Sequence, residues 1–224
     1  MSGAEIFPSK PEPGGLFPQW IRVSFWVCIV IAVAAVVLRA IALSVSVRGG
    51  RPPGTAELDA HFKGHAALTW THILCALGYV LLLPFCFWKR TRSLPLVTGM
   101  FFGLGFVVGA TAYAMNRYAI GGWVERSAIL FFNTLFLSEL VYALLLRRRG
   151  DPAGERVWSI RATAALLGIA ATRPVVGVFF ATSPLTHLTP SQFFGYAFWT
   201  GFSINTLAIE VWLRSRARAE RILS

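Results

Sequence analysis

Residues 60–88 read AHFKGHAALTWTHILCALGYVLLLPFCFW and decide the character of the chain. The stretch begins with polar residues, is almost wholly apolar after His72, and ends at Trp88 against a basic run at residues 89–92. About 20 apolar residues in a row are enough for a helix to cross the hydrocarbon core of a bilayer. Lys and Arg collect at the cytoplasmic end of such a helix. The stretch therefore predicts a membrane-spanning helix with one polar end and one basic end.

The composition of all 224 residues agrees with this prediction. Hydrophobic residues make up 55% of the chain and charged residues only 14%, whereas soluble domains carry about 25% charged residues. The net charge of +11 comes from basic residues at the ends of apolar segments, which is where such residues set membrane orientation. Nucleic acid is therefore not the expected partner. Membrane lipids and other membrane protein subunits are expected instead.

Apolar segments alternate with turn-forming and charged residues, and this pattern predicts an all-α bundle of six transmembrane helices. The expected helices cover residues 19–45, 60–88, 94–116, 123–146, 157–181 and 191–213. They form one transmembrane domain over residues 19–214. A cytoplasmic N-terminal tail over residues 1–18 and a basic cytoplasmic C-terminal tail over residues 215–224 flank this domain.

Basic clusters follow the second, fourth and sixth expected helices, at residues 89–92, 147–156 and 214–221. With six helices, all three clusters lie on one side of the membrane, and the positive-inside rule makes that side cytoplasmic. Both termini are then cytoplasmic. We expect a multi-pass protein of the bacterial inner membrane.

Three of the four histidines, His61, His65 and His72, lie within residues 60–88 at spacings of four and seven. On a helix they fall within about 40° of one another around the axis. His61 and His65 are one turn apart and form a candidate metal site. His72 lies roughly 10–16 Å further along the axis, so it is instead a candidate axial ligand of haem b. The alternative is that the first two are interfacial polar residues and that His72 packs as a hydrogen-bonded side chain.

Arg173 is expected at the depth of His72, in the outer part of the helix over residues 157–181. Charges within the membrane are costly and usually face a partner or a cavity. Arg173 is therefore a candidate to hold a lipid phosphate, a haem propionate or a quinone carbonyl. The alternative is a bond to backbone carbonyls freed by Pro174. His187, in a loop on the same side of the membrane, is the remaining candidate for a second haem ligand.

Arg161 and Glu210 are both expected near the cytoplasmic face, so a structural ion pair between them is predicted. Glu139 is expected in the inner part of its helix and Asn205 within the last helix, and we interpret both as structural polar residues. Glycines at residues 99, 103, 105 and 109 give one helix two pairs of small residues four apart. Such pairs let helices approach closely, which predicts a central place for the helix over residues 94–116.

Several short motifs carry a resemblance. They are His72 to Gly78 continuing to Leu83-Pro84-Phe85, Val157-Trp158-Ser159-Ile160-Arg161, Thr172-Arg173, and Trp199 through Asn205 to Glu210. On these motifs residues 60–214 resemble the DUF2306 family of bacterial integral membrane proteins, whose function is not established. The family has a His-Arg-x-x-Gly-Arg element where this chain reads Pro95 to Met100, and a histidine where it has Glu155. The resemblance implies a membrane bundle that has lost polar residues of the family, which favours a non-catalytic role.

Two functions from different classes follow from these observations. The first is a non-catalytic scaffold or accessory subunit of a larger membrane complex, which binds lipid and partner helices. The second is a membrane redox protein that binds haem b or a quinone, with His72 as ligand and Arg173 as anion partner. The chain carries no nucleophile elbow, P-loop, GxGxxG, HExxH or CxxC motif, and enzymatic activity is not expected.

Overall fold

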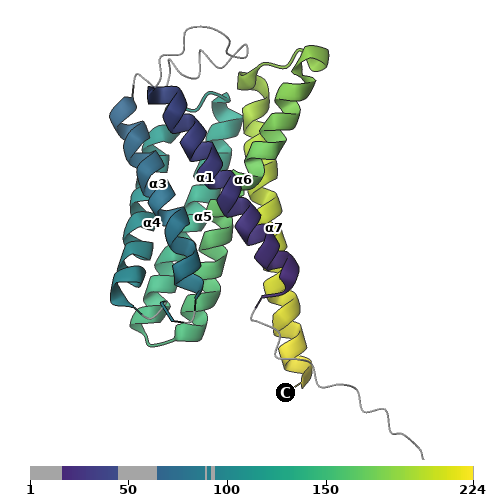
Figure 1. The fold of residues 1–224 in the computed structure, drawn as a ribbon. Helices are drawn as coiled ribbons and strands as arrows, with labels where there is room; N and C mark the ends of the chain where they lie inside the picture. Colours follow the sequence, from purple (N-terminus) through teal and green to yellow (C-terminus); the bar gives the residue numbers. More distant parts are fainter. Residues whose placement is uncertain (1–16, 45–64, 89, 92–93, 224) are drawn as a thin grey trace, which may run out of the picture.

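In a computed structural model of the protein, residues 17–44, 65–88, 90–91 and 94–223 are described. All regular structure in these residues is helical (Figure 1). The helices are α1 (Gln19–Ser44), α3 (Ala66–Phe87), α4 (Pro95–Asn116), α5 (Gly122–Arg148), α6 (Pro152–Thr186) and α7 (Pro190–Leu223). Five of them, α1 and α3 to α6, are long and apolar enough to cross a membrane. The prediction of an all-α, multi-pass membrane protein is thereby confirmed.

The helices form a ring to which a further helix is added. Helix α1 contacts α3, α3 contacts α4, α4 contacts α5, α5 contacts α6, and α6 contacts α1 again. Helix α7 packs against both α5 and α6. Helix α1 crosses the bundle diagonally, and α6 and α7 form an antiparallel pair (Figure 1). The start of α1 and the end of α7 lie toward the same end of the bundle in this view, together with the turns that follow α3 and α5.

The predicted central place of the helix over residues 94–116 is wrong. Helix α4 packs against α3 and α5, whereas α6 packs against α1, α5 and α7. The reason lies in how the glycines of α4 are distributed around its axis. Gly99 and Gly103 face open space, whereas Gly105 meets the side chains of Leu140 and Tyr79. Only part of the glycine pattern is therefore used for packing.

The closest backbone approach is made by α7, and the sequence pattern did not reveal it. A Cβ atom added to Gly195 would lie 2.7 Å from the backbone nitrogen of Glu125, and one added to Gly201 would lie 2.5 Å from that of Thr172. No side chain fits at either distance. These two glycines therefore allow the backbone of α7 to pack closely against α5 and α6.

Two helix boundaries differ from those expected. Helix α3 begins at Ala66 with His65 as its N-cap, rather than at Ala60, and residues 45–64 lie outside the described part of the chain. Helix α7 continues to Leu223, so the basic segment expected as a tail is a helical extension in its described part. The expected N-terminal tail lies almost wholly outside the described residues.

Helix α6 is also longer than expected. It begins at Pro152, where the side chain of Asp151 accepts a hydrogen bond from the backbone nitrogen of Gly154 at 2.8 Å. A side-chain oxygen at this position satisfies a backbone donor that the helix start leaves free. The helix continues through Pro184 to Thr186. The loop expected to begin at Thr182 therefore starts only at His187.

Candidate functional site

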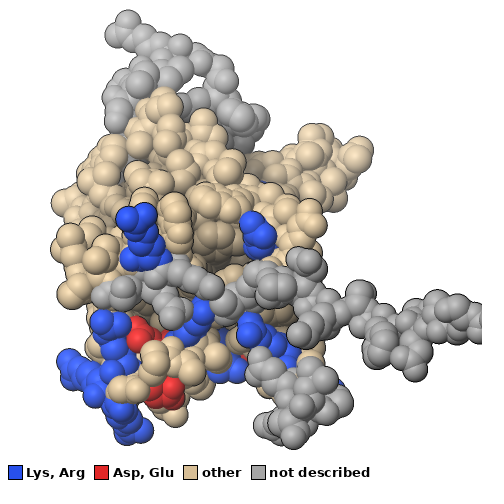
Figure 2. All heavy atoms as spheres, turned by 60° about the horizontal axis from the view of Figure 1, so that its bottom comes forward, with Lys and Arg blue, Asp and Glu red and all other residues tan. Residues whose placement is uncertain are grey.

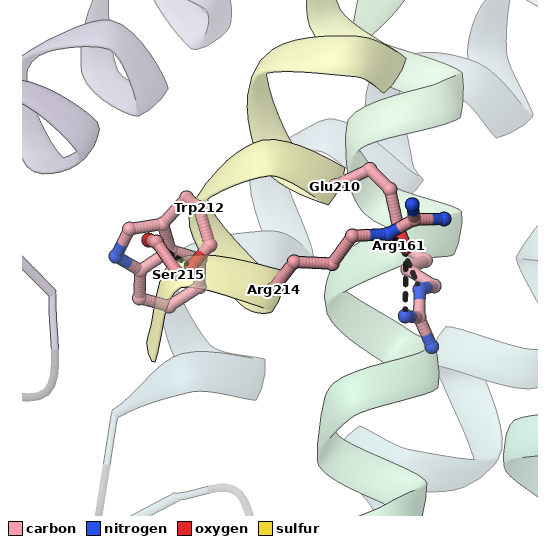
Figure 3. Close-up of polar contacts among 5 residues, drawn as sticks. All are labelled: Arg161, Glu210, Trp212, Arg214 and Ser215. Atoms are coloured by element: carbon pink, nitrogen blue, oxygen red, sulfur yellow. Dashed lines mark hydrogen bonds and ion pairs between the residues drawn. The ribbon is translucent and has the colours of Figure 1, made fainter. Parts of the chain in front are cut away.

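The most highly charged cluster inside the bundle joins α6 to α7 (Figure 3). Arg161 Nε donates to Glu210 Oε2 at 2.9 Å, and Arg161 Nη2 donates to Glu210 Oε1 at 3.4 Å. Arg214 Nε donates to Glu210 Oε1 at 2.7 Å from one turn further along α7. This is the pairing of Arg161 with Glu210 that their shared depth predicts. One carboxylate thus binds two guanidinium groups, and the cluster has a net positive charge.

The cluster is partly shielded from its surroundings. The side chains of Arg161 and Glu210 are 20% and 27% exposed, whereas that of Arg214 is 73% exposed. The guanidinium of Arg161 lies 4.5 Å from the ring centre of Trp158, a geometry that favours a cation. The ion pair within the bundle is therefore the structural one, and Arg214 supplies an outer contact.

Glu139 lies beside this cluster on α5 and is only 5% exposed. It belongs to the buried face of α5 with Phe132, Phe136, Leu140 and Ala143. Its carboxyl group interacts electrostatically with Arg161 and with Glu210. Its Oε2 atom has no hydrogen-bond partner among the described residues. The structure thus adds a buried carboxyl group to the charged cluster, a proximity that the sequence did not predict.

His72 is tied to the neighbouring helix. Its Nδ1 atom lies 2.8 Å from Thr111 Oγ1 on α4. The hydroxyl of Thr111 already donates to the carbonyl oxygens of Val107 and Val108, at 2.7 and 3.0 Å. With its single hydrogen given to these carbonyls, the Thr111 hydroxyl is able to accept from Nδ1–H of His72 in the tautomer that carries a hydrogen there. His72 therefore packs between α3 and α4 as a hydrogen-bonded side chain, which is the alternative interpretation of this residue from the sequence.

The predicted placement of His65 and His72 on one helix is wrong. His65 precedes α3 as its N-cap and does not share a helix with His72, because the chain departs from helical geometry at this residue. The ring of His65 lies 3.6 Å from that of Tyr118. His61, the other half of the candidate metal site, lies outside the described residues. Among the residues that the structure describes, no three His, Cys, Asp or Glu side chains are placed to hold a metal ion.

His72, Arg173 and His187 each have different neighbours in the structure. His72 bonds to α4, whereas Arg173 is exposed on α6 and is close enough to Arg39 of α1 for the two charges to repel. His187 is exposed and ends α6 in the left-handed conformation at φ 55°, with its backbone N–H bonded to Ser183 O at 2.8 Å. No hydrogen bond or ion pair among the described residues joins any two of these three residues, and their use in a haem or quinone site stays a prediction.

Other intramembrane polar side chains also join one helix to the next. Asn133 of α5 donates to the carbonyl oxygen of Gly109 on α4 at 3.0 Å. Trp199 of α7 donates to Ser127 Oγ on α5 at 3.2 Å. Asn205 of α7 points its amide at Cys28 Sγ of α1, 3.8 Å away. The sequence did not predict the contact of Trp199 with Ser127.

Comparison of the chain with protein-family models, with curated proteins and with solved structures found no match. The comparisons therefore place the chain in no family, and the resemblance to DUF2306 stays a prediction. Any function has to be inferred from the geometry of the bundle itself.

Proposed function

We propose that the protein is a non-catalytic scaffold or accessory subunit of a larger complex in the bacterial cytoplasmic membrane. One observation carries this proposal: the polar residues that are candidates for a site mostly make bonds between helices. His72 bonds α3 to α4, Arg161 and Glu210 bond α6 to α7, and Asn205 joins α7 to α1. Polar groups used in this way hold a bundle together within lipid.

In this proposal α7 is the sixth transmembrane helix, and both termini are cytoplasmic. The polar side chains of α7 that lower its mean hydropathy contact other helices, as Trp199, Asn205 and Glu210 do. Its outward side carries exposed apolar residues such as Ile204 and Leu207, which suit contact with lipid. Basic residues gather over the end of the bundle at which α1 begins and α7 ends (Figures 1 and 2), which supports a cytoplasmic location for that end.

Helix α1 is the best candidate for contact with a partner. Its apolar span is 11% buried, compared with 22–33% for the other four spans. The inner face of α1 packs on the bundle through Ile29 and Ala32. The outer face carries a stripe of exposed residues at alternating spacings of three and four: Trp20, Val23, Val27, Val30, Ala34, Val37 and Ile41. We call these residues the α1 stripe.

The α1 stripe fits a transmembrane helix of a partner subunit. Spacings of three and four average 3.5 residues, the repeat of helices that cross in a left-handed sense, which most membrane bundles adopt. Ala34 lies in the second half of the stripe, and its small side chain lets a second backbone approach. Valines on either side present short branched side chains that lose little conformational entropy on packing.

Photo-crosslinking in the native membrane tests the proposal. A photoreactive amino acid is placed at Val30 of the α1 stripe, which is 64% exposed, and as a control at Leu81 of α3, which is 50% exposed. We expect one discrete protein adduct from Val30, weakened by Ala34→Leu, and only lipid adducts from Leu81. Lipid adducts alone at both positions would overturn the partner contact.

Binding of haem b or a quinone is the second candidate, favoured by one observation. The contact of His72 Nδ1 with Thr111 leaves Nε2 as the ring nitrogen that could ligate a haem iron. A visible spectrum of protein purified from its native membrane, before and after dithionite, decides between the two functions. A Soret band that is lost in His72→Ala would replace the scaffold proposal, whereas a colourless protein would end the haem proposal.

A further inference from the structure

A cavity opens among α3, α4, α5 and α6 near the ends of these helices that carry the basic clusters. Its volume is about 270 Å³. The lining includes apolar residues such as Phe87 and Phe101, which we call the apolar wall, and polar residues such as Thr98 and Ser159, which we call the polar wall. This combination suits a ligand with one polar end and one apolar end.

Two arginines of the lining make the polar wall positive. Arg147 lies in the last turn of α5, and Arg156 lies in the second turn of α6. Glu155 also lines the cavity and bonds to Arg147 Nη1 at 3.0 Å. This bond engages one nitrogen of a guanidinium group that has five N–H donors. The two arginines and one glutamate leave the wall with a net positive charge.

The start of α6 adds to this positive potential. The first turn of α6 contributes Pro152 and Glu155 to the lining, and the start of a helix carries a partial positive charge. Arginine binds phosphate through paired N–H donors, and Ser and Thr hydroxyls donate to the remaining oxygens. The lining therefore matches a phosphate group better than a carboxamide or a cation.

We propose that this cavity binds a phosphate group, with the apolar wall receiving the first part of the chain that carries it. Basic pockets between membrane helices on the cytoplasmic side are typical sites of anionic phospholipid headgroups. An inner-leaflet phospholipid meets both walls, and free phosphate meets the polar wall alone. The choice of the inner leaflet rests on the topology given under the proposed function, whereas the phosphate site itself does not depend on the scaffold role, because it concerns a different surface.

Native mass spectrometry of the delipidated, detergent-purified full chain tests the site. Phosphatidylglycerol is titrated as the lipid probe, with inorganic phosphate as the free-anion probe. We expect Arg147→Gln combined with Arg156→Gln to weaken the first bound phosphatidylglycerol by about tenfold or more, because two charge-assisted contacts are lost. Ser159→Phe fills the cavity without changing its charge, and we expect the same loss from it.

The matched control removes the same two charges from the neighbouring surface. Arg148 and Arg149 follow Arg147 directly and are exposed outside the cavity lining. Arg148→Gln combined with Arg149→Gln is expected to change the affinity by less than about twofold. An equal loss in this control, or no loss in Ser159→Phe, would overturn the proposal. Binding of inorganic phosphate that needs Arg147 and Arg156, with no retained lipid, would support phosphate recognition and assign it to a free anion.

Variants that do not fold are recognised before titration. Size-exclusion profiles in detergent identify them, and Arg147→Gln with Glu155→Gln provides a neutral replacement of the ion pair. If this pair variant folds and binds phosphatidylglycerol as tightly as the unaltered chain, the role of Arg147 in the site is overturned.

Discussion

Arg161 and Glu210 are 49 residues apart in the chain and face each other across the contact of α6 with α7, with two nitrogen–oxygen contacts to one carboxylate. The pair is the strongest polar connection between these two helices. Its 20% and 27% side-chain exposure separates it from a surface ion pair.

Breaking this pair is predicted to destabilise the bundle. Arg161→Gln and Glu210→Gln should each lower the free energy of unfolding by about 1–2 kcal/mol. The first leaves Glu210 with only the exposed Arg214, and the second leaves Arg161 without a carboxylate. The double variant should cost less than the sum of the two single variants. Arg214→Gln, which removes a 73% exposed partner of the same carboxylate, should cost well under 1 kcal/mol. Unfolding in mixed micelles measures all four, and equal effects of Arg161→Gln and Arg214→Gln would contradict the prediction.

The close contact of α7 with α6 at Gly201 should not tolerate an added methyl group. Gly201→Ala places a Cβ against the backbone of Thr172 on α6, and overpacking of this kind costs about 1–3 kcal/mol. Gly103→Ala on α4 is the matched control, because a Cβ there meets nothing within 4 Å. We expect the melting temperature to fall for Gly201→Ala and to stay unchanged or rise for Gly103→Ala. A similar loss in both variants would show that the close approach is not specific to α7.

Glu139 should tolerate loss of its charge but not reversal of it. Glu139→Gln keeps the size of the side chain and supplies an amide within the bundle, so we expect folded yield close to that of the unaltered chain. Glu139→Lys would bury a further cation beside Arg161, which the cost of burying like charges forbids. Yield and monodispersity in detergent measure both. A loss in Glu139→Gln as severe as in Glu139→Lys would mean that the carboxylate charge is required beside Arg161.

Cysteine labelling in intact cells tests the proposed topology. In a chain whose native cysteines are replaced by alanine, Thr189→Cys should react with a membrane-impermeant maleimide from outside. Arg149→Cys and Arg218→Cys should react only after the cells are permeabilised, because both lie on the cytoplasmic side if α7 spans the membrane. Labelling of Arg218→Cys from outside, with Arg149→Cys protected, would show that α7 does not cross.

Hydropathy predicts the helices of this chain well because each apolar run is long and bounded by charges. The expected depths of Arg161 and Glu210 in the membrane also predict their pairing, because a charge within a membrane has few possible partners at its own depth. The same arguments do not identify the neighbours of a helix. The glycines of α4 have the expected small-residue spacing, yet the closest backbone approach is made by Gly195 and Gly201 of α7, which have no stronger pattern.

The histidines show a second limit of the sequence. The histidines can align along one helix only if that helix is continuous, and the helix that carries His72 begins only after His65. No capping side chain marks this start: His65 makes no side-chain hydrogen bond to the helix end. Glu139 shows a third limit, since its proximity to Arg161 depends on the rotation of α5 within the ring. Rotation follows from packing against several helices at once.

The length of α6 has a consequence for the bilayer in which the protein works. Its 35 residues extend about 52 Å at 1.5 Å per residue, whereas the hydrocarbon core is about 30 Å thick. Helix α3, with 22 residues, extends only about 33 Å and matches that core closely. Helix α6 therefore extends beyond the hydrocarbon core, and its first turns, which carry Glu155 and Arg156, belong to the polar headgroup region. The charged lining of the cavity is in this way held at the level of the headgroups by a helix that continues through the membrane.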